Sequence, residues 1–347
     1  MLTRHTFIKA LGAVVLPLAL FLSVSPVAQA VTLNITYDSS VSSAPAGFKN
    51  AINYVAQTFD SYFTNPVDVN INVGWGEVAG QTLSANAVGE SITNYYSGST
   101  IYNTIAQDLY NTDSAASNSS TAHSAAQYIP ATSPIKTSMY ISAANAKAIG
   151  AVANSTTTSD GSVGFDSSYA YSFNTTGPTA SGTYDFVGLA MHEISEVMGR
   201  TGFLPGSTSG TYYQTPLDLF RYTSPGVLDT NSPGTANYFS VNGGSTSLNT
   251  FNTISGADYA DWAGATPDAF NAFIGSPGTT EPFSVADLSV LNAIGWQTSN
   301  ATYSTVASIA SASSAVPGPL TTELLALAAL ACLFGFRKKE RDSALFA

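Results

Sequence analysis

Residues 185–200 read Asp-Phe-Val-Gly-Leu-Ala-Met-His-Glu-Ile-Ser-Glu-Val-Met-Gly-Arg. Large apolar side chains recur in this stretch at spacings of four, three and four, at Val187, Met191, Ile194 and Met198. That spacing is typical of a helix with one buried face. Gly199 follows the last apolar position, and glycine commonly ends a helix because it adopts left-handed backbone angles without a steric penalty. The stretch therefore predicts an amphipathic helix that ends at Gly199.

The same helix carries three polar residues whose spacing suggests a metal centre. At 100° per residue, His192 and Glu196 lie about 40° apart, on a face beside the apolar one. In the pattern His-Glu-x-x-His, two side chains four residues apart hold one metal ion, and the Glu between them is the general base of a hydrolase. Here His192 matches the first ligand and Glu193 the base. Glu196 stands where a second His is expected.

A metal site on this helix needs a third protein ligand, and Asp218 is the candidate. It lies in a compact segment twenty-two residues after Glu196. The alternative is that Asp218 pairs with Arg221 or caps a turn. Carboxylates leave the ion with less net positive charge than neutral imidazoles do. The set His192, Glu196 and Asp218 therefore admits Zn²⁺ or a harder cation such as Mn²⁺ or Ca²⁺.

Other candidate ligands have less in their favour. His123 is the one further histidine after residue 30, and it lies in a stretch rich in Ser, Ala and Thr, residues 111–134, that predicts a surface excursion. Asp258 and Asp261 stand near glycines, where they are either a calcium site or ordinary loop residues. We therefore do not assign these residues to the site.

The N-terminal end has the order of parts of a signal peptide. Arg4 and Lys9 precede a mostly apolar run over residues 10–24, and Ala-Gln-Ala at 28–30 is an A-x-A cleavage site. We therefore expect the chain to be exported, with residues 1–30 removed.

The C-terminal end also has the composition of a targeting segment. Val-Pro-Gly-Pro at 316–319 is followed by an apolar run at 324–336 and a basic cluster at 337–341. Thirteen apolar residues rise about 20 Å as a helix, short of the ~30 Å hydrocarbon core unless flanking residues contribute. Basic residues after an apolar segment favour the cytoplasmic side. A C-terminal membrane anchor without processing is the alternative to the sorting signal described next.

The tail also resembles the PEP-CTERM sorting signal of Gram-negative bacteria, with Gly318 at the usual Glu position. The resemblance implies an exosortase-like sorting transpeptidase as a partner and transient anchoring in the inner membrane through a short transmembrane segment, 324–336. The final location would be the cell surface or the extracellular space.

Composition excludes several classes of partner. Residues 31–315 contain five Lys and Arg against nineteen Asp and Glu, and the whole chain has a formal net charge of −11. Because phosphate contacts require a basic face, we expect no nucleic-acid partner. Membrane contact is expected only through the tail. The single cysteine, Cys332, lies in that tail, so the domain has no disulfide. We expect a monomer.

The pattern along residues 31–296 predicts an α/β (α+β) fold. Residues 31–37 and 67–73 alternate as strands, and residues 48–63 have the apolar spacing of a helix. Residues 161–165 and 169–173 predict two strands around a turn. Asn-Gly-Gly at 242–244 predicts a hairpin. Residues 284–296 predict a helix with Ser284 as its N-cap and Asp287 in a variant capping box.

Five segments together resemble PEP-CTERM-associated secreted metalloproteases of the zincin type. They are Ala-Pro-Ala-Gly-Phe at 44–48, Asn-Ile-Asn-Val-Gly-Trp-Gly-Glu at 70–77, Met-His-Glu-Ile-Ser-Glu-Val-Met-Gly-Arg at 191–200, Leu-Asp-Leu-Phe-Arg-Tyr at 217–222 and Asp-Leu-Ser-Val-Leu-Asn-Ala-Ile-Gly-Trp at 287–296. The resemblance implies a mixed sheet with an active-site helix and an irregular C-terminal subdomain. It implies a zinc peptidase acting on protein or peptide substrates, with His192 as ligand and Glu193 as base. Position 202, where some relatives of this type have a third ligand, is Gly202.

These observations give a domain plan and two competing functions. The plan is a signal peptide at 1–30, a zincin-like domain at 31–296 divided after residue 200, a Ser/Ala/Thr linker at 297–315 and the sorting signal at 316–347. The first function is a secreted, surface-sorted metallopeptidase. The alternative is a catalytically inactive surface or matrix protein that keeps the zincin scaffold. A glycan-binding module has only the Tyr-rich composition in its favour.

Overall fold

The computed structural model of the chain describes residues 30–98, 101–115, 120–134, 138–205, 212–230, 234–314 and 337–342. Residues 1–29 of the expected signal peptide and the whole apolar segment 324–336 lie outside these ranges. Within them, no helix is both long and apolar enough to span a bilayer.

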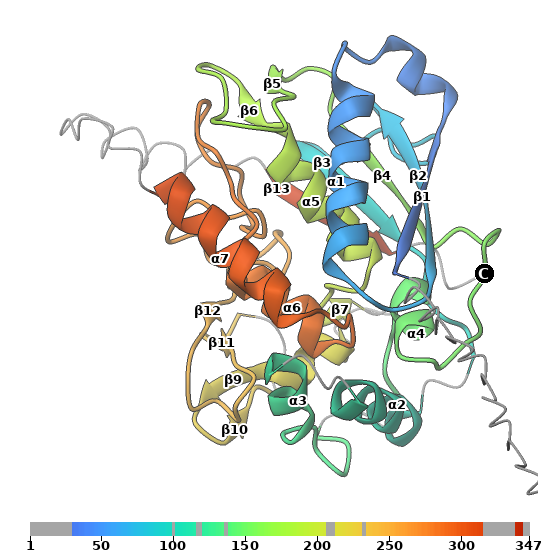
Figure 1. Ribbon diagram of the computed structural model, residues 1–347, viewed down its shortest axis with the longest axis vertical. Coiled ribbons are helices and arrows are strands. Elements are labelled where there is room, and N and C mark those ends of the chain that lie inside the picture. Colours follow the sequence, from blue (N-terminus) through green and yellow to red (C-terminus); the bar gives the residue numbers. More distant parts are fainter. Residues whose placement is uncertain are drawn as a thin grey trace, which may run out of the picture.

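The described chain is a mixed α/β fold (Figure 1). Its helices are α1 (Phe48–Tyr62), α2 (Tyr102–Ala115), α3 (Ser120–Ala126), α4 (Ala143–Ala148), α5 (Phe186–Val197), α6 (Val285–Ala293) and α7 (Asn300–Ser314), with 3₁₀ helices η1 (Ser39–Ser43) and η2 (Pro216–Phe220). Its strands are β1 (Thr32–Tyr37), β2 (Asp68–Trp75), β3 (Ala87–Thr93), β4 (Gly161–Phe165), β5 (Tyr171–Ser172), β6 (Tyr184–Asp185), β7 (Leu204–Pro205), β8 (Tyr212–Tyr213), β9 (Arg221–Ser224), β10 (Val227–Leu228), β11 (Tyr238–Phe239), β12 (Asn249–Thr250) and β13 (Arg337–Asp342).

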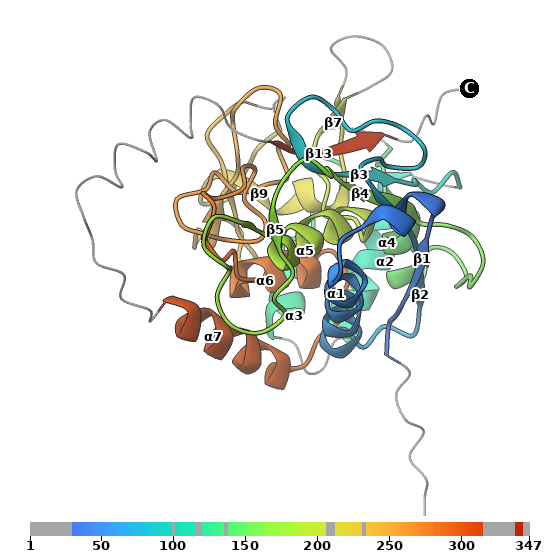
Figure 2. The ribbon, with the colours of Figure 1, turned by 90° about the horizontal axis from the view of Figure 1, so that it is seen from above.

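The central sheet has the strand order β1-β2-β4-β3-β13. Strands β1, β2 and β4 are parallel to one another, whereas β3 runs antiparallel to β4. Strand β13, from the far end of the chain, pairs in parallel with the outer edge of β3 (Figure 2). The mixed sheet expected from the sequence is therefore confirmed.

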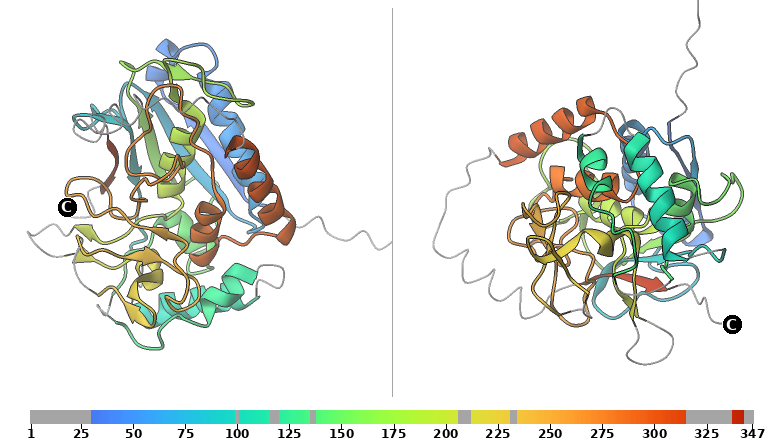
Figure 3. Two further views of the ribbon diagram at one scale, coloured as in Figure 1. Left: turned by 90° about the vertical axis from the view of Figure 1, so that its left-hand side faces the viewer. Right: turned by 90° about the horizontal axis from the view of Figure 1, so that it is seen from below.

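Helices α1 and α5 lie side by side against one face of this sheet (Figures 1 and 3). The apolar stripe of α1 is completely buried, at Phe48, Ile52, Val55 and Phe59. Helix α5 contacts β3 and β4 as well as α1, so it is enclosed on several sides. A helix that is apolar on most faces is typical of a domain core, and the polar residues of α5 are thereby brought into that core.

A smaller antiparallel sheet, in the order β10-β9-β11-β12, forms much of the C-terminal part. Strands β11 and β12 pair as the hairpin predicted around Asn242-Gly243-Gly244. Helix α6 begins at the predicted N-cap, where Ser284 and Asp287 form a reciprocal capping box. These local features were predicted correctly because each depends on a few neighbouring residues.

Three segments differ from the expectation. Residues 111–134, expected as a surface excursion, contain the end of α2 and the whole of α3, because Tyr102, Ile105 and Leu109 give α2 a buried stripe that starts before the excursion. Strands β4 and β5 do not pair with each other, since β4 joins the central sheet and β5 pairs with β6. Within the expected linker, residues 300–314 form α7, which buries Val306.

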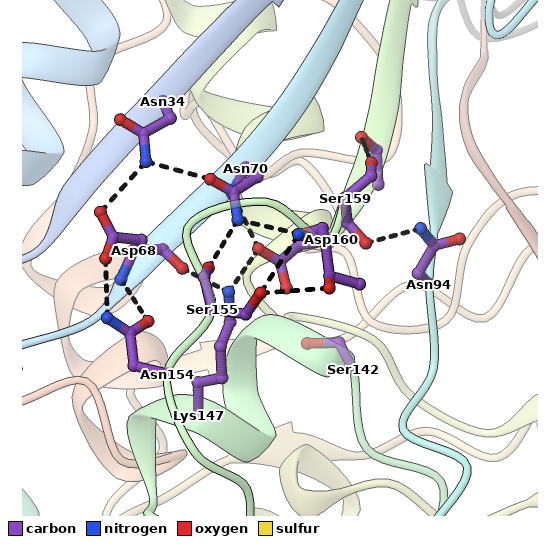
Figure 4. A network of polar contacts seen from close by, with 12 residues as sticks. Asn34, Asp68, Asn70, Asn94, Ser142, Lys147, Asn154, Ser155, Ser159 and Asp160 are labelled. Atoms are coloured by element: carbon purple, nitrogen blue, oxygen red, sulfur yellow. Dashed lines mark hydrogen bonds and ion pairs between the residues drawn. The ribbon is translucent and has the colours of Figure 1, made fainter.

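A polar network ties the loop before β4 to β1 and β2 (Figure 4). At its centre, Lys147 Nζ lies 2.7 Å from Asp160 Oδ2, and both side chains are buried. Asp160 also accepts the backbone N–H of Asn70 at 2.7 Å. Because a buried charge is costly without a partner, this ion pair stabilises the loop only as an intact unit.

Asp113 of α2 is a buried acid outside any such network. Its two carboxyl oxygens have no hydrogen-bond partner among the described residues, and burial raises the pKa of Asp113 well above its ordinary value. The unfolded chain ionises this group near pH 4, so the native state loses stability as the pH rises from about 4 through the native pKa. We expect Asp113→Asn to remove that loss. The difference in Tm, variant minus wild type, should increase by several degrees from pH 4 to pH 8, and a constant difference would contradict this account.

Candidate metal centre

Helix α5 is defined at both ends by local hydrogen bonds. At its start, the Asp185 side chain accepts the backbone N–H of Val187 at 3.1 Å. At its end, Gly199 has φ of 110°, and the N–H groups of Gly199 and Arg200 bond to the carbonyls of Glu196 and Ser195. This is the Schellman arrangement, which favours glycine. It turns the chain so that the Arg200 side chain returns along the helix.

His192, Glu196 and Asp261 converge at the inner face of α5. Their exposed fractions are 0%, 1% and 0%. His192 Nε2 lies 3.1 Å from Glu196 Oε1 and 3.4 Å from Asp261 Oδ1. One ligand atom from each residue lies within 4.8 Å of the other two. The structure therefore gathers two of the predicted ligands with a carboxylate that the sequence did not assign to the site.

The hydrogen bond on the other ring nitrogen determines what His192 presents to this cluster. Nδ1 lies 2.9 Å from the carbonyl oxygen of Ala269, and a carbonyl can only accept, so Nδ1 carries a hydrogen. A neutral His192 then presents the Nε2 lone pair to two carboxylate oxygens. Three acceptors at this spacing repel one another unless positive charge from a proton, a metal cation or a neighbouring side chain compensates them. Metal-bound histidines are commonly oriented by such a bond from their other nitrogen.

Two of the three distances among the ligand atoms are close to those of a tetrahedral metal site. Zinc binds nitrogen and carboxylate oxygen at about 2.0–2.2 Å, so ligand atoms at tetrahedral angles lie about 3.3–3.6 Å apart. His192 Nε2 lies 3.1 Å from Glu196 Oε1, just below that range, and 3.4 Å from Asp261 Oδ1, within it. We conclude that one histidine and two carboxylates are placed where a divalent ion can be held.

Arg200 contributes a fixed positive charge to the same cluster. Its Nη1 lies 2.5 Å from Asp261 Oδ1, and its Nη2 lies 3.2 Å from Glu196 Oε1. Burial alone would lower the pKa of Arg200, but the two carboxylates outweigh it and raise the pKa above its ordinary value. The guanidinium therefore stays charged and bridges the two acidic groups.

The electrostatics of Glu196 reflect this enclosure. Burial raises the pKa of Glu196 to about 8, the Arg200 charge opposes that rise and Asp261 adds to it. Its second oxygen, Oε2, accepts the hydroxyl of Ser91 on β3 at 2.8 Å. With Oε2 engaged by Ser91, Glu196 presents Oε1 alone to His192.

The predicted base, Glu193, lies between α5 and β3. It is buried, and its carboxyl group interacts directly with that of Glu196. Gly89 of β3 makes room for it, since an ideal Cβ at Gly89 would lie 2.5 Å from Glu193 Oε1. Glu193, the predicted base, therefore packs beside the three-residue cluster against Gly89 of β3, which has no side chain at the point of contact.

Replacing Gly89 by Ala should displace this base. No real Cβ atom tolerates a 2.5 Å approach to a carboxylate oxygen, so Glu193 must shift. For the hydrolase expected from the sequence, activity should fall at least about tenfold, because small displacements of a catalytic group are costly, whereas ion content should stay near that of the wild type. Activity assays and metal analysis of the same preparation check this, and unchanged activity would contradict the placement of Glu193.

Asp218 is not brought to the cluster and has the structural role that was its alternative. Its Oδ2 accepts the backbone N–H of Phe203 at 2.9 Å and that of Thr215 at 2.8 Å. Its Oδ1 lies 3.3 Å from Arg221 Nε. Burial raises the pKa of Asp218, and Arg221 opposes that rise. The sequence contains a signal for this role, because Thr215 and Asp218 have capping-box spacing and form such a box at the start of η2.

Asp261 takes the third place in the cluster through long-range contacts. Its carbonyl accepts the N–H of Asn252 at 2.8 Å, and the next residue, Trp262, is buried and bridges to Phe251 and Asn271. No local pattern connects Asp261 with a helix more than sixty residues earlier. Arg200 was also missed, although its spacing of four from Glu196 is the spacing of a helical ion pair.

Comparison of the chain with protein-family models, with curated proteins and with solved structures finds no match in any of the three.

Proposed function

We propose that this chain is an exported, surface-sorted metallopeptidase whose ion is held by His192, Glu196 and Asp261. The observation that supports this most strongly is the convergence of three buried acceptor atoms, with His192 oriented through its Nδ1 hydrogen bond. Such an arrangement requires positive charge beside it, of which Arg200 supplies one part, and a bound cation would supply the rest. Zn²⁺ suits its size and donor atoms, and Mn²⁺ is the next candidate.

In the proposed peptide hydrolysis, a bound ion and Glu193 of helix α5 would have different roles. A bound divalent ion supplies Lewis acidity to such a site. Glu193 is the residue of this chain that would accept a proton from the attacking water and return it to the leaving nitrogen. Its position beside Glu196 and Gly89 supports that role.

An extended peptide is the substrate class that the neighbouring strand favours. The outer edge of β3 already accepts β13 as a parallel strand, with Lys338 opposite Gly89. Main-chain pairing at an edge strand is a common way to bind extended peptides. Because the cluster is enclosed, a substrate would reach it only after a covering segment moves, and β13 covers the edge beside Glu193.

Proteolysis by the full chain tests the proposal. Purified protein should degrade an unfolded protein substrate when supplied with Zn²⁺ or Mn²⁺. A chelator should abolish the activity, and excess ion should restore it. An ion-loaded protein with intact fold and no activity against varied unfolded substrates would contradict the peptidase assignment.

A non-catalytic surface protein is the second candidate, and Arg200 is the observation that favours it. The guanidinium already neutralises part of the acidic charge, and a proton on His192 Nε2 would neutralise more. The cluster would then be an ion-paired core feature of a retained scaffold. Restoration of a histidine by Glu196→His separates the two. Zinc binding and activity that appear only in this variant would favour the scaffold.

A further inference from the structure

The side chain that distinguishes this cluster from a simple metal site is Arg200. Its two terminal nitrogens contact Asp261 Oδ1 and Glu196 Oε1, which are the same two oxygens that face His192 Nε2. A guanidinium with two parallel donors matches a pair of carboxylate oxygens in both charge and geometry. Arg200 therefore contacts the same two carboxylate oxygens that would bind a metal ion.

The Arg200 side chain also makes contacts outside the two carboxylates. Its Nε donates to Ser195 Oγ at 2.8 Å, and Nη2 lies 3.4 Å from the carbonyl oxygen of His192. Its Cζ lies 4.2 Å from the centroid of the Phe270 ring. The Schellman turn at Gly199 fixes the backbone from which the side chain starts. A long side chain held at so many points loses little further entropy when it pairs with the carboxylates.

We propose that Arg200 is a positioning residue that acts as a built-in counter-cation, holding Glu196 and Asp261 at ligand spacing in the ion-free protein and weakening the binding of a divalent ion there. The inference rests on the proposed function, because the ion is the competing partner of the same two oxygens. It explains how two acidic side chains remain buried side by side without a metal.

Two effects of opposite sign follow for ion binding and stability. Without Arg200, the ion-free protein keeps two buried carboxylates with no guanidinium beside them, and removal of one partner of a buried ion pair is strongly destabilising. The bound ion, in contrast, no longer faces a fixed positive charge in a poorly screened environment. Loss of Arg200 should therefore weaken the ion-free fold and strengthen ion binding.

The test compares the full-length wild type with Arg200→Met, Glu196→Gln/Arg200→Met and Arg221→Met. In chelator, Arg200→Met should lower Tm by about 10 °C, and the added Glu196→Gln should recover a substantial part of that loss.

On titration with Zn²⁺, Arg200→Met should bind the ion at least about tenfold more tightly than the wild type does. Arg221→Met is the matched control, because Arg221 is a buried Arg whose ion pair is with Asp218 and on which Asp261 has a smaller effect than Asp218. Its loss of Tm should not be reversed by Zn²⁺ beyond the wild-type gain. Arg200→Gln gives the same comparison if Arg200→Met does not yield folded protein.

The outcomes separate this inference from the proposed function. A wild-type Tm for Arg200→Met in chelator, or Zn²⁺ affinity no greater than that of wild type, would overturn the role of Arg200 while leaving a metal centre in place. Zn²⁺ binding by Arg200→Met but not by wild type would support the role of Arg200 and overturn the metallopeptidase. Absence of Zn²⁺ binding in both proteins would overturn both.

Discussion

Replacement of Glu193 by Gln is expected to reduce peptide hydrolysis at least about 100-fold, which is the scale of a lost general base. The amide has nearly the shape of the carboxylate, but it cannot accept a proton from water at neutral pH. His192, Glu196 and Asp261 are unchanged in this variant, so the ion should remain. The expected signature is therefore inactive protein with wild-type metal content.

Glu90→Gln is the matched control for this variant. Glu90 is also a buried Glu, and it belongs to β3 itself. Its carboxylate accepts the N–H of Ser84, in the segment before that strand, at 2.6 Å. Its replacement should affect stability more than the chemical step. Wild-type turnover by Glu193→Gln would rule out Glu193 as the base.

Asp261→Asn should weaken ion binding by more than about 100-fold, whereas Asp218→Asn should leave it nearly unchanged. Loss of an outer hydrogen-bond partner of a ligand alone typically costs about 10–100-fold in affinity, so loss of a ligand should cost more. Asp261 Oδ1 lies 3.4 Å from His192 Nε2, whereas Asp218 is engaged with Phe203, Thr215 and Arg221.

The pair of variants is matched because each removes one buried carboxylate that contacts an Arg. Both should therefore lose stability, and ion affinity alone separates them. Competition with a chromophoric chelator at 25 °C measures that affinity. Equal losses in the two variants, or a larger loss in Asp218→Asn, would show that the third ligand is not Asp261.

The parts of this fold that depend on local sequence were predictable. The apolar spacing of residues 187–198 and the glycine after it predicted α5, and alternation predicted β1 and β2. The Ser284–Asp287 capping box marked the start of α6 because both partners lie within one helical turn. Each of these signals is contained in a few consecutive residues.

The candidate site was only partly predictable because its third acidic residue comes from a distant loop. Asp261 reaches α5 through the packing of Trp262 and a main-chain bond to Asn252, and neither leaves a pattern near residue 192. Asp218 does not lie in the observed cluster, because its carboxylate is engaged in a capping box with Thr215. A candidate ligand that also completes a capping box should be discounted.

Burial of the whole cluster is a second feature that the sequence did not show. The polar residues of α5 were expected on a separate face beside the buried apolar one, but His192, Glu193 and Glu196 are all buried. The reason is tertiary: β3 covers Glu193 and Glu196, and the segment around Ala269 covers His192. Hydrogen bonds and the charge of Arg200 compensate for the cost of burying these polar groups.

Metal analysis of the purified full-length chain, run beside His192→Ala, tests the central claim most directly. A metal centre predicts about one equivalent of zinc or manganese per chain in the wild type and its loss in His192→Ala. No bound divalent metal in a correctly folded wild type, even after incubation with excess Zn²⁺ and Mn²⁺, would contradict the metal centre and favour the ion-paired, non-catalytic scaffold.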